Sequence, residues 1–142
     1  MKIFIFVLLL FFPIFAIAQK SGDTVDLRYY PPDPESVDSQ KLPKIVPWLA
    51  HGMPFFNARK KILEYGWKPL NFKKTWLADE APDCELLDCQ LHRKGVIELK
   101  GCPTDKPVCV FYYRKGHSWL QLMATGEELQ DLTVYYWANQ SP

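Results

Sequence analysis

Four cysteines constrain this chain more than any other feature, because all of them fall between residues 84 and 109 of a 142-residue sequence. Cys84, Cys89, Cys102 and Cys109 are an even number in a short chain, which predicts two disulfides in an oxidising compartment. Four cysteines allow three pairings, and the sequence does not choose among them. We favour the local pairs Cys84–Cys89 and Cys102–Cys109. Because a regular helix holds residues five apart too far from each other for a disulfide, Cys84 would then precede a helix or lie in a distorted first turn.

A zinc site is the alternative use of these residues. Its ligands would be Cys84 and Cys89, His92 in the Cys-x2-His spacing, and either Cys102 or Cys109. The spacing is loose for zinc, and an oxidising compartment does not keep four thiols reduced. We therefore expect disulfides and no metal or other cofactor.

The N-terminus predicts export. Lys2 supplies a positive end, residues 3–12 are an uninterrupted apolar run, and Ala16-Ile17-Ala18 has the form that a signal peptidase cuts. The apolar stretch ends before the roughly 20 residues that a membrane-spanning helix needs. We expect residues 1–18 to be a signal peptide and the product to be periplasmic or secreted, without a membrane anchor. The Ala-x-Ala ending favours a bacterial source.

The charge of the expected mature chain bears on its partners. Removal of 18 from 142 residues leaves 124, enough for one domain. Lys2 is the one charged residue removed, so 16 basic and 16 acidic residues remain. Because nucleic-acid binding needs a basic excess on one face, we expect no nucleic-acid partner.

The chain divides into a leader and a domain. Residues 19–47 are polar and rich in proline, which predicts an extended or disordered leader. Its apolar residues, Leu27 to Tyr30, could dock on the domain through Tyr29 and Tyr30, but we favour a solvated tether. The domain would then span residues 48–142.

Two helices are expected at the start of the domain. The first begins at Pro54, presents one apolar face and turns its basic residues outward. Gly66 ends it, with Trp67 folding back on the last turn. A shorter helix is expected from about Asp83 to Lys94, with Gly95 as its stop. The expected face of the first helix is Phe55, Ala58, Ile62 and Tyr65, its outward residues Arg59, Lys60 and Lys61, and the inward residues of the second Leu87 and Leu91.

After Gly95 the apolar period changes to two. Residues 96–100, 108–114, 118–125 and 132–138 are rich in β-branched and aromatic residues and predict four strands. Arg114-Lys115-Gly116-His117 predicts the tight turn between the second and third of them. Helices followed by successive strands predict an α+β fold, with the helices packed on one face of a four-stranded antiparallel meander. We expect Leu120, Leu122, Val134 and either the Phe111 or the Tyr112 set to face the helices.

A resemblance accompanies this pattern. The helix end Tyr65-Gly66-Trp67-Lys68-Pro69 and Cys102-x6-Cys109 running into Val110-Phe111-Tyr112-Tyr113 resemble a group of small exported bacterial proteins of unknown function. The resemblance covers residues 52–138 and rests on structural motifs, so it implies no functional residues. The chain departs from that pattern in Cys84 and Cys89 and in a less glycine-rich loop after Cys102. The element order and Gly52-Met53 also resemble β-lactamase-inhibitor proteins and small outer-membrane assembly lipoproteins, which is a likeness of fold alone.

Catalytic patterns are weak. His51, His92 and His117 show no two-ligand spacing, and His117-Ser118 lies in an expected turn. Glu127-Glu128 fits a solvated loop better than the paired carboxylates of a glycosidase, since adjacent residues seldom converge on one substrate. We therefore expect no catalytic residues and no enzyme.

Aromatic residues give the one candidate site. If Leu120, Leu122 and Val134 face the helices, four aromatic residues fall on the opposite sheet face, which would suit a protein or a sugar. The alternatives are that the leader covers this face or that some of the four are core residues. We expect a protein-binding module, such as an inhibitor or an envelope accessory protein, and as the alternative a carbohydrate or cell-wall binder. The candidate residues are Tyr113, Trp119, Tyr135 and Trp137.

Overall fold

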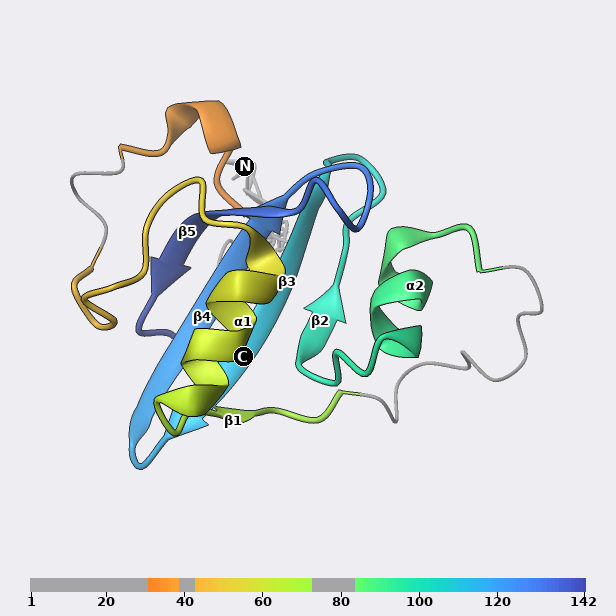
Figure 1. The fold of residues 1–142 in the computed structure, drawn as a ribbon. Coiled ribbons are helices and arrows are strands. Elements are labelled where there is room, and N and C mark those ends of the chain that lie inside the picture. Colours follow the sequence, from red (N-terminus) through yellow and green to blue (C-terminus); the bar gives the residue numbers. More distant parts are fainter. Residues whose placement is uncertain (1–30, 39–42, 73–83) are drawn as a thin grey trace, which may run out of the picture.

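The computed structural model describes residues 31–38, 43–72 and 84–142 (Figure 1). The signal peptide expected at residues 1–18 and the docking residues Tyr29 and Tyr30 lie outside these ranges. Within them the chain is an α+β domain with two α-helices, an antiparallel sheet and two disulfides. A single 3-10 turn, Pro34–Ser36, precedes the helices. Among the described residues, no helix is both long and apolar enough to cross a membrane.

The sheet contains the predicted four-stranded meander and one further strand. Strands β2 (Leu99–Gly101), β3 (Val108–Lys115), β4 (Ser118–Thr125) and β5 (Thr133–Ala138) follow one another antiparallel, as predicted. The added strand β1 (Lys68–Pro69) pairs with β3 beyond β2, so two short strands share one edge of β3.

Strand β2 is shorter than its apolar run predicted. The backbone carbonyls of Ile97 and Glu98 instead accept hydrogen bonds of 2.9 and 3.1 Å from Phe72 and Tyr112. At the opposite edge, residues 52–55 run along β5, where the Gly52 and Val134 backbones bond at 2.7 Å. Both edges of the sheet are therefore covered in part by non-strand backbone.

Helix α1 spans Phe55–Glu64 and lies across one face of the sheet (Figure 1). It ends as the sequence predicted: Gly66 has φ +82°, its N–H bonds to the Leu63 carbonyl, and the Trp67 N–H bonds back to Ile62. This pair of hydrogen bonds is a Schellman motif, which glycine favours because it lacks a β carbon. The buried face was predicted one turn too long, since Tyr65 at the helix end is 56% exposed.

Helix α2 spans Leu87–Arg93, shorter at its start than predicted. Leu91 is buried and Leu87 partly buried, as expected for the inward residues. Gly95 has φ +75° just beyond the helix and ends it.

The main core lies between the helices and the sheet. Leu120, Leu122 and Val134 face this core, as predicted. Of the two alternatives on β3, the Phe111 set faces the helices and the Tyr112 set faces away from them. Phe111 stacks on Phe55 of α1 with ring centroids 4.2 Å apart. A second, smaller apolar cluster lies on the other face of the sheet and consists of Val108, Val110, Tyr112, Met123 and Tyr135.

The described part of the proline-rich leader is packed against the domain. The Tyr135 hydroxyl donates to the Pro32 carbonyl at 3.0 Å, and the Trp137 indole N–H donates to the Pro43 carbonyl at 2.6 Å. Val46 is buried in the main core, and Val37 packs on the second cluster. For residues 31–38 and 43–47, the expectation of a solvated tether is therefore wrong.

Candidate functional site

The four aromatic residues predicted to form a binding face do not share a surface. Tyr113 and Trp137 are buried in the helix-side core, and Tyr135 is buried on the other face. Trp119 alone is partly exposed, on the face away from the helices. The predicted aromatic face is therefore wrong as a continuous surface.

Strand registry explains the two misplaced residues. Tyr113 follows Phe111 by two positions on β3, so it points to the same, helix-side face. On β5 a bulge places both Tyr135 and Tyr136 opposite Met123, because the pairing passes from Val134↔Ala124 directly to Tyr136↔Met123. One extra residue reverses the alternation, so Trp137 joins Val134 in the core.

The cysteines form the favoured local pairs. Cys84 and Cys89 are bonded with Cα atoms 5.5 Å apart, and Cys84 precedes α2 as that pairing required. Cys102 and Cys109 are bonded with Cα atoms 4.2 Å apart. The cysteines therefore cannot serve as the thiolate ligands of the zinc alternative. No group of three or more metal-binding side chains occurs within residues 31–38, 43–72 and 84–142.

The weak catalytic candidates lie apart. His117 is exposed in the turn before β4, whereas Glu127 and Glu128 are exposed in the loop after it. Because β4 is eight residues long, these groups lie at opposite ends of the sheet. The Glu128 carboxylate accepts a hydrogen bond from the Gln130 amide.

A buried polar cluster joins α1 to the sheet. Glu98 is fully buried, and its carboxylate lies 2.6 Å from Nε of Arg59 and 2.9 Å from the Tyr113 hydroxyl. Arg59 also donates to the Gly95 carbonyl at 3.1 Å, so it turns inward rather than outward as predicted. Burial alone would lower the pKa of Arg59, but the hydrogen bond and charge of Glu98 leave that pKa raised. With its oxygens already engaged and no exposed surface, Glu98 is suited to holding the fold rather than a ligand.

A candidate site is a pocket of about 440 Å³ at the hairpin end of the domain. The end of α1, strand β1 and the β3–β4 turn meet there. Gly116 is the first residue of the two-residue turn and has φ +59°, as tight hairpins require. We call this site the hairpin pocket; its lining residues are Gly66, Lys68, Pro69, Leu70, Arg114, Lys115 and Gly116.

Three exposed cations line the hairpin pocket. Lys68 and Arg114 are opposite each other in the β1–β3 register, so they point to the same face of the sheet. The Lys115 amine donates to the Tyr65 carbonyl at 2.6 Å and so ties the hairpin to the end of α1. Within the described part of the chain, no carboxylate forms an ion pair with any of the three.

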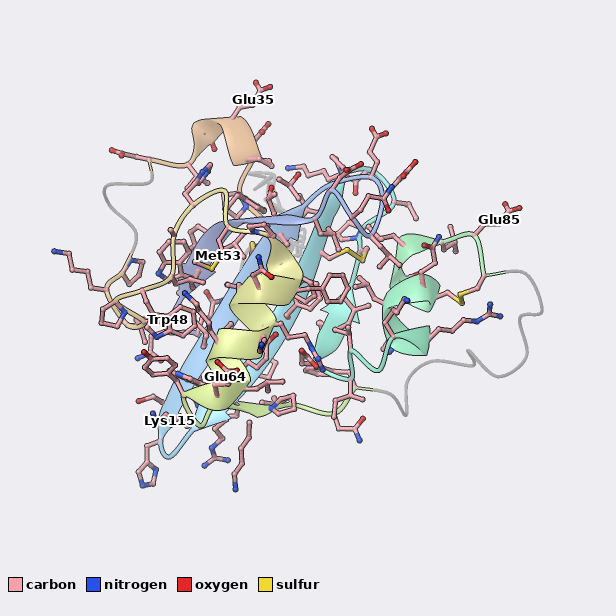
Figure 2. The ribbon with its side chains drawn as sticks, viewed as in Figure 1. Glu35, Trp48, Met53, Glu64, Glu85 and Lys115 are labelled. Carbon is pink, nitrogen blue, oxygen red and sulfur yellow. A yellow bond between two sulfur atoms is a disulfide. The ribbon has the colours of Figure 1, made fainter. Side chains whose placement is uncertain are left out.

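Two aromatic residues lie near the hairpin on the helix side of the sheet, whereas Lys68 and Arg114 point to the other side with Trp119. The rings of Trp48 and Tyr65 are 5.1 Å apart between centroids, and the Lys61 amine lies 5.8 Å above the Trp48 ring. Figure 2 shows Trp48 and Lys115 on the same side of the molecule, with Glu85 on the opposite side. We call Trp48 and Tyr65 the aromatic pair.

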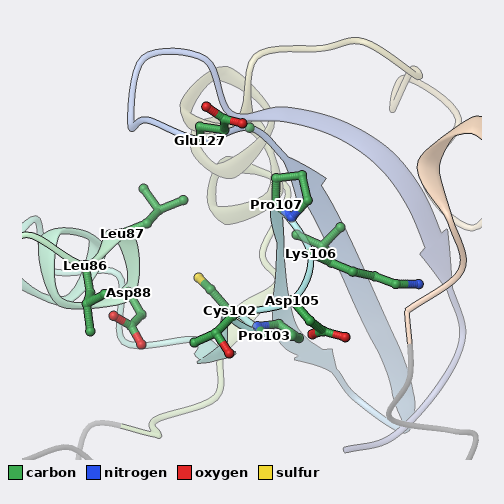
Figure 3. A pocket seen from close by; sticks show the side chains of 12 residues that line it. Leu86, Leu87, Asp88, Cys102, Pro103, Asp105, Lys106, Pro107 and Glu127 are labelled. Carbon is green, nitrogen blue, oxygen red and sulfur yellow. The ribbon is translucent and has the colours of Figure 1, made fainter.

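A second pocket, of about 370 Å³, lies between α2 and the loop that precedes β3 (Figure 3). Its walls include Leu86, Leu87 and Pro107, and its acidic residues are Asp88, Asp105 and Glu127. Asp88 accepts a hydrogen bond of 2.7 Å from the Cys89 backbone, so it already stabilises the start of α2. Asp88 is therefore engaged within the fold, as Lys115 is in the hairpin pocket.

Comparison with known proteins gives no family assignment: no protein-family model, curated protein or solved structure matches this chain. The candidate site consequently rests on geometry alone.

Sequence reasoning missed the hairpin pocket. A formal charge near zero conceals a local cluster, because charge is summed over the chain and not over a surface. The available signal was the position of Lys68 just after the helix-ending Gly66 and of Arg114-Lys115 just before the turn glycine. Those two glycines mark chain reversals, but their proximity in space depends on the packing of α1 against the hairpin.

Proposed function

We propose that this chain is an exported, non-catalytic protein-binding module, such as an inhibitor or an envelope accessory protein, and that it binds its partner at the hairpin end. Export is supported by the signal-like N-terminus and by the two disulfides, which suit an oxidising compartment.

The observation that carries the proposal is the exposure of Tyr65 beside Trp48. Tyr65 is 56% exposed although it is a large aromatic residue, and it belongs to the aromatic pair. Tyrosine and tryptophan are the residues that most often dominate the binding energy of protein interfaces. Lys61, above the Trp48 ring, and Lys115, at the Tyr65 carbonyl, can provide a polar rim around such an anchor.

The test compares two exposed side chains at different ends of the domain. Immobilised wild-type protein is used to isolate a partner from an envelope extract, and the purified partner is titrated against Tyr65→Ala and Leu86→Ala. Leu86 is the matched control because it is 64% exposed and lies at the other pocket. We expect Tyr65→Ala to weaken binding about ten-fold or more, as truncation of an interface anchor does, and Leu86→Ala to have no effect. Equal binding by both variants would refute the hairpin end as the interface.

A carbohydrate or cell-wall ligand is the second candidate. It is favoured by Trp119, which is the one partly exposed residue of the four predicted aromatic residues. Soluble cell-wall fragments should then quench tryptophan fluorescence, and Trp119→Ala should abolish that quenching. A flat titration with the wild-type protein would exclude this candidate.

A further inference from the structure

We infer that the ligand of the hairpin pocket is a carboxylate-rich segment of a polypeptide, held by Lys68 and Arg114. This inference rests on the proposed function and adds the chemistry of the partner. It follows from the charge of the site, from its shape and from the apolar residues in its wall.

The first argument is the state of the cations. Lys68 and Arg114 are exposed, line one pocket and have no carboxylate partner among the described residues. Nε of Arg114 is engaged at 2.9 Å by the Gly116 carbonyl, which holds the guanidinium in place and leaves its two terminal amino groups. Guanidinium groups bind carboxylates through two parallel hydrogen bonds. The pocket therefore presents an oriented guanidinium and an ammonium to an anion.

The second argument is the shape of the site. Both glycines in the pocket wall have positive φ, and a β carbon at Gly116 would meet no atom within 4 Å. The wall is therefore open to close approach by a ligand backbone. A volume of about 440 Å³ is within the range of about 300–1,000 Å³ for ligand pockets, which accommodates a few side chains of a peptide.

The third argument favours a polypeptide over other polyanions. The pocket wall combines the two cations with Pro69 and Leu70, so one partner segment can place an apolar side chain against the wall and acidic ones on the cations. The Arg114 guanidinium lies 5.1 Å above the Trp119 ring and occupies a face on which a sugar would stack.

The test uses defined probes and charge-matched variants. The probe is a fluorescein-labelled, glutamate-rich peptide containing one tyrosine, and its counterpart has glutamine in place of glutamate. Binding is measured by fluorescence anisotropy to the wild type, to Lys68→Gln with Arg114→Gln, and to Lys44→Gln with Lys94→Gln. The control positions are exposed and lie outside the hairpin pocket, and the two double variants lose the same charge. Lys115 is left unchanged because it holds the Tyr65 carbonyl.

We expect the acidic peptide to bind the wild type and the control, to bind the Lys68/Arg114 variant about ten-fold or more weakly, and to weaken as salt is raised. The glutamine peptide should not bind. If both double variants lose the same affinity for the acidic peptide, binding depends on net charge alone and the inference is overturned. Tighter binding of an oligothymidylate or of a sulfated heparin oligosaccharide than of the peptide would overturn it in favour of another polyanion.

A final comparison separates this inference from the proposed function. If the isolated partner loses affinity for Tyr65→Ala but keeps it for the Lys68/Arg114 variant, the interface stands and the acidic ligand is wrong. If the partner binds both variants as it binds the wild type, both proposals are wrong. Circular dichroism spectra matching the wild type confirm that each variant is folded.

Discussion

The Arg59 guanidinium and the Glu98 carboxylate form an ion pair 2.6 Å long between α1 and the segment that precedes β2. Glu98 is fully buried, while the Arg59 side chain keeps 22% of its surface exposed. A buried carboxylate depends on its partners, because desolvation costs several kcal/mol per ion when it is not compensated. The pair therefore fixes how the helix lies on the sheet.

Replacement of Arg59 by methionine should destabilise the domain. The variant keeps the length of the side chain but leaves Glu98 with the Tyr113 hydroxyl as its remaining side-chain donor among the described residues. We expect the free energy of unfolding to fall by about 2 kcal/mol, less than for a fully buried pair because Arg59 is partly exposed. Urea denaturation measures the change, with Lys60→Met as a surface control. A loss similar to that of the control would show that the pair contributes little.

Stability should also fall at alkaline pH because of Tyr113. Burial raises the pKa of Tyr113 well above its ordinary value, and the charge and hydrogen bond of Glu98 raise it further. A pKa raised by folding means that the stabilisation is complete below the unfolded-state pKa of about 10 and is lost as pH rises toward the folded pKa. Burial also raises the pKa of Tyr135, so Tyr135 contributes to the same loss of stability at alkaline pH.

Phenolate absorbance and denaturation above pH 10 test this expectation. In Tyr113→Phe, the part of the alkaline loss of stability that Tyr113 causes should disappear. Identical pH profiles for the wild type and the variant would contradict the assignment.

The two disulfides should contribute unequally. Cys109 is fully buried in the main core, whereas Cys84 is partly exposed just before α2. Each short loop should contribute about 2 kcal/mol through the unfolded state. Replacement of Cys102 and Cys109 by alanine should cost more than that, because it also leaves a void in the core. Thermal unfolding of the two double-alanine variants measures the difference, and a greater loss from Cys84 and Cys89 would be the contrary result.

Two glycines with positive φ should respond differently to alanine. A β carbon on Gly126 would lie 2.9 Å from the Asp131 backbone, while one on Gly116 would meet no atom within 4 Å. Gly116→Ala should cost about 1 kcal/mol through backbone strain alone. Gly126→Ala should cost clearly more, because backbone must move to relieve the clash. Denaturation midpoints of the two variants decide this, and equal costs would mean that the loop adjusts freely.

Local signals in the sequence predicted much of the fold. The end of α1 depends on Gly66, Trp67 and Pro69, whose preferences act within a few residues, and the structure matches the prediction there. The turn at Gly116 and the meander of β2 to β5 likewise follow from short-range period and turn chemistry. Strand β1 was not predicted because it has two residues, one of them a proline, and is too short to show the alternating pattern of a strand.

Long-range contacts determined what the sequence could not predict. The bulge at Tyr135 turns Trp137 to the helix side of the sheet, and no residue type in β5 indicates a bulge. Arg59 was expected in solvent because its partner Glu98 lies 39 positions away. The hairpin pocket was missed for the same reason, since Lys68 and Arg114 meet only through the register of β1 on β3.

The placement of β1 and β2 end to end along β3 bears on behaviour at high concentration. A long, flat strand at the edge of a sheet has unpaired backbone groups to which other chains can bind and form fibrils. Here the outer strands β1 and β2 have two and three residues. Strand β1 also contains Pro69, which has no N–H to donate. The opposite rim, along β5, is occupied by residues 52–55. Such interrupted borders leave little template for amyloid growth, so the folded protein should stay dispersed when it accumulates.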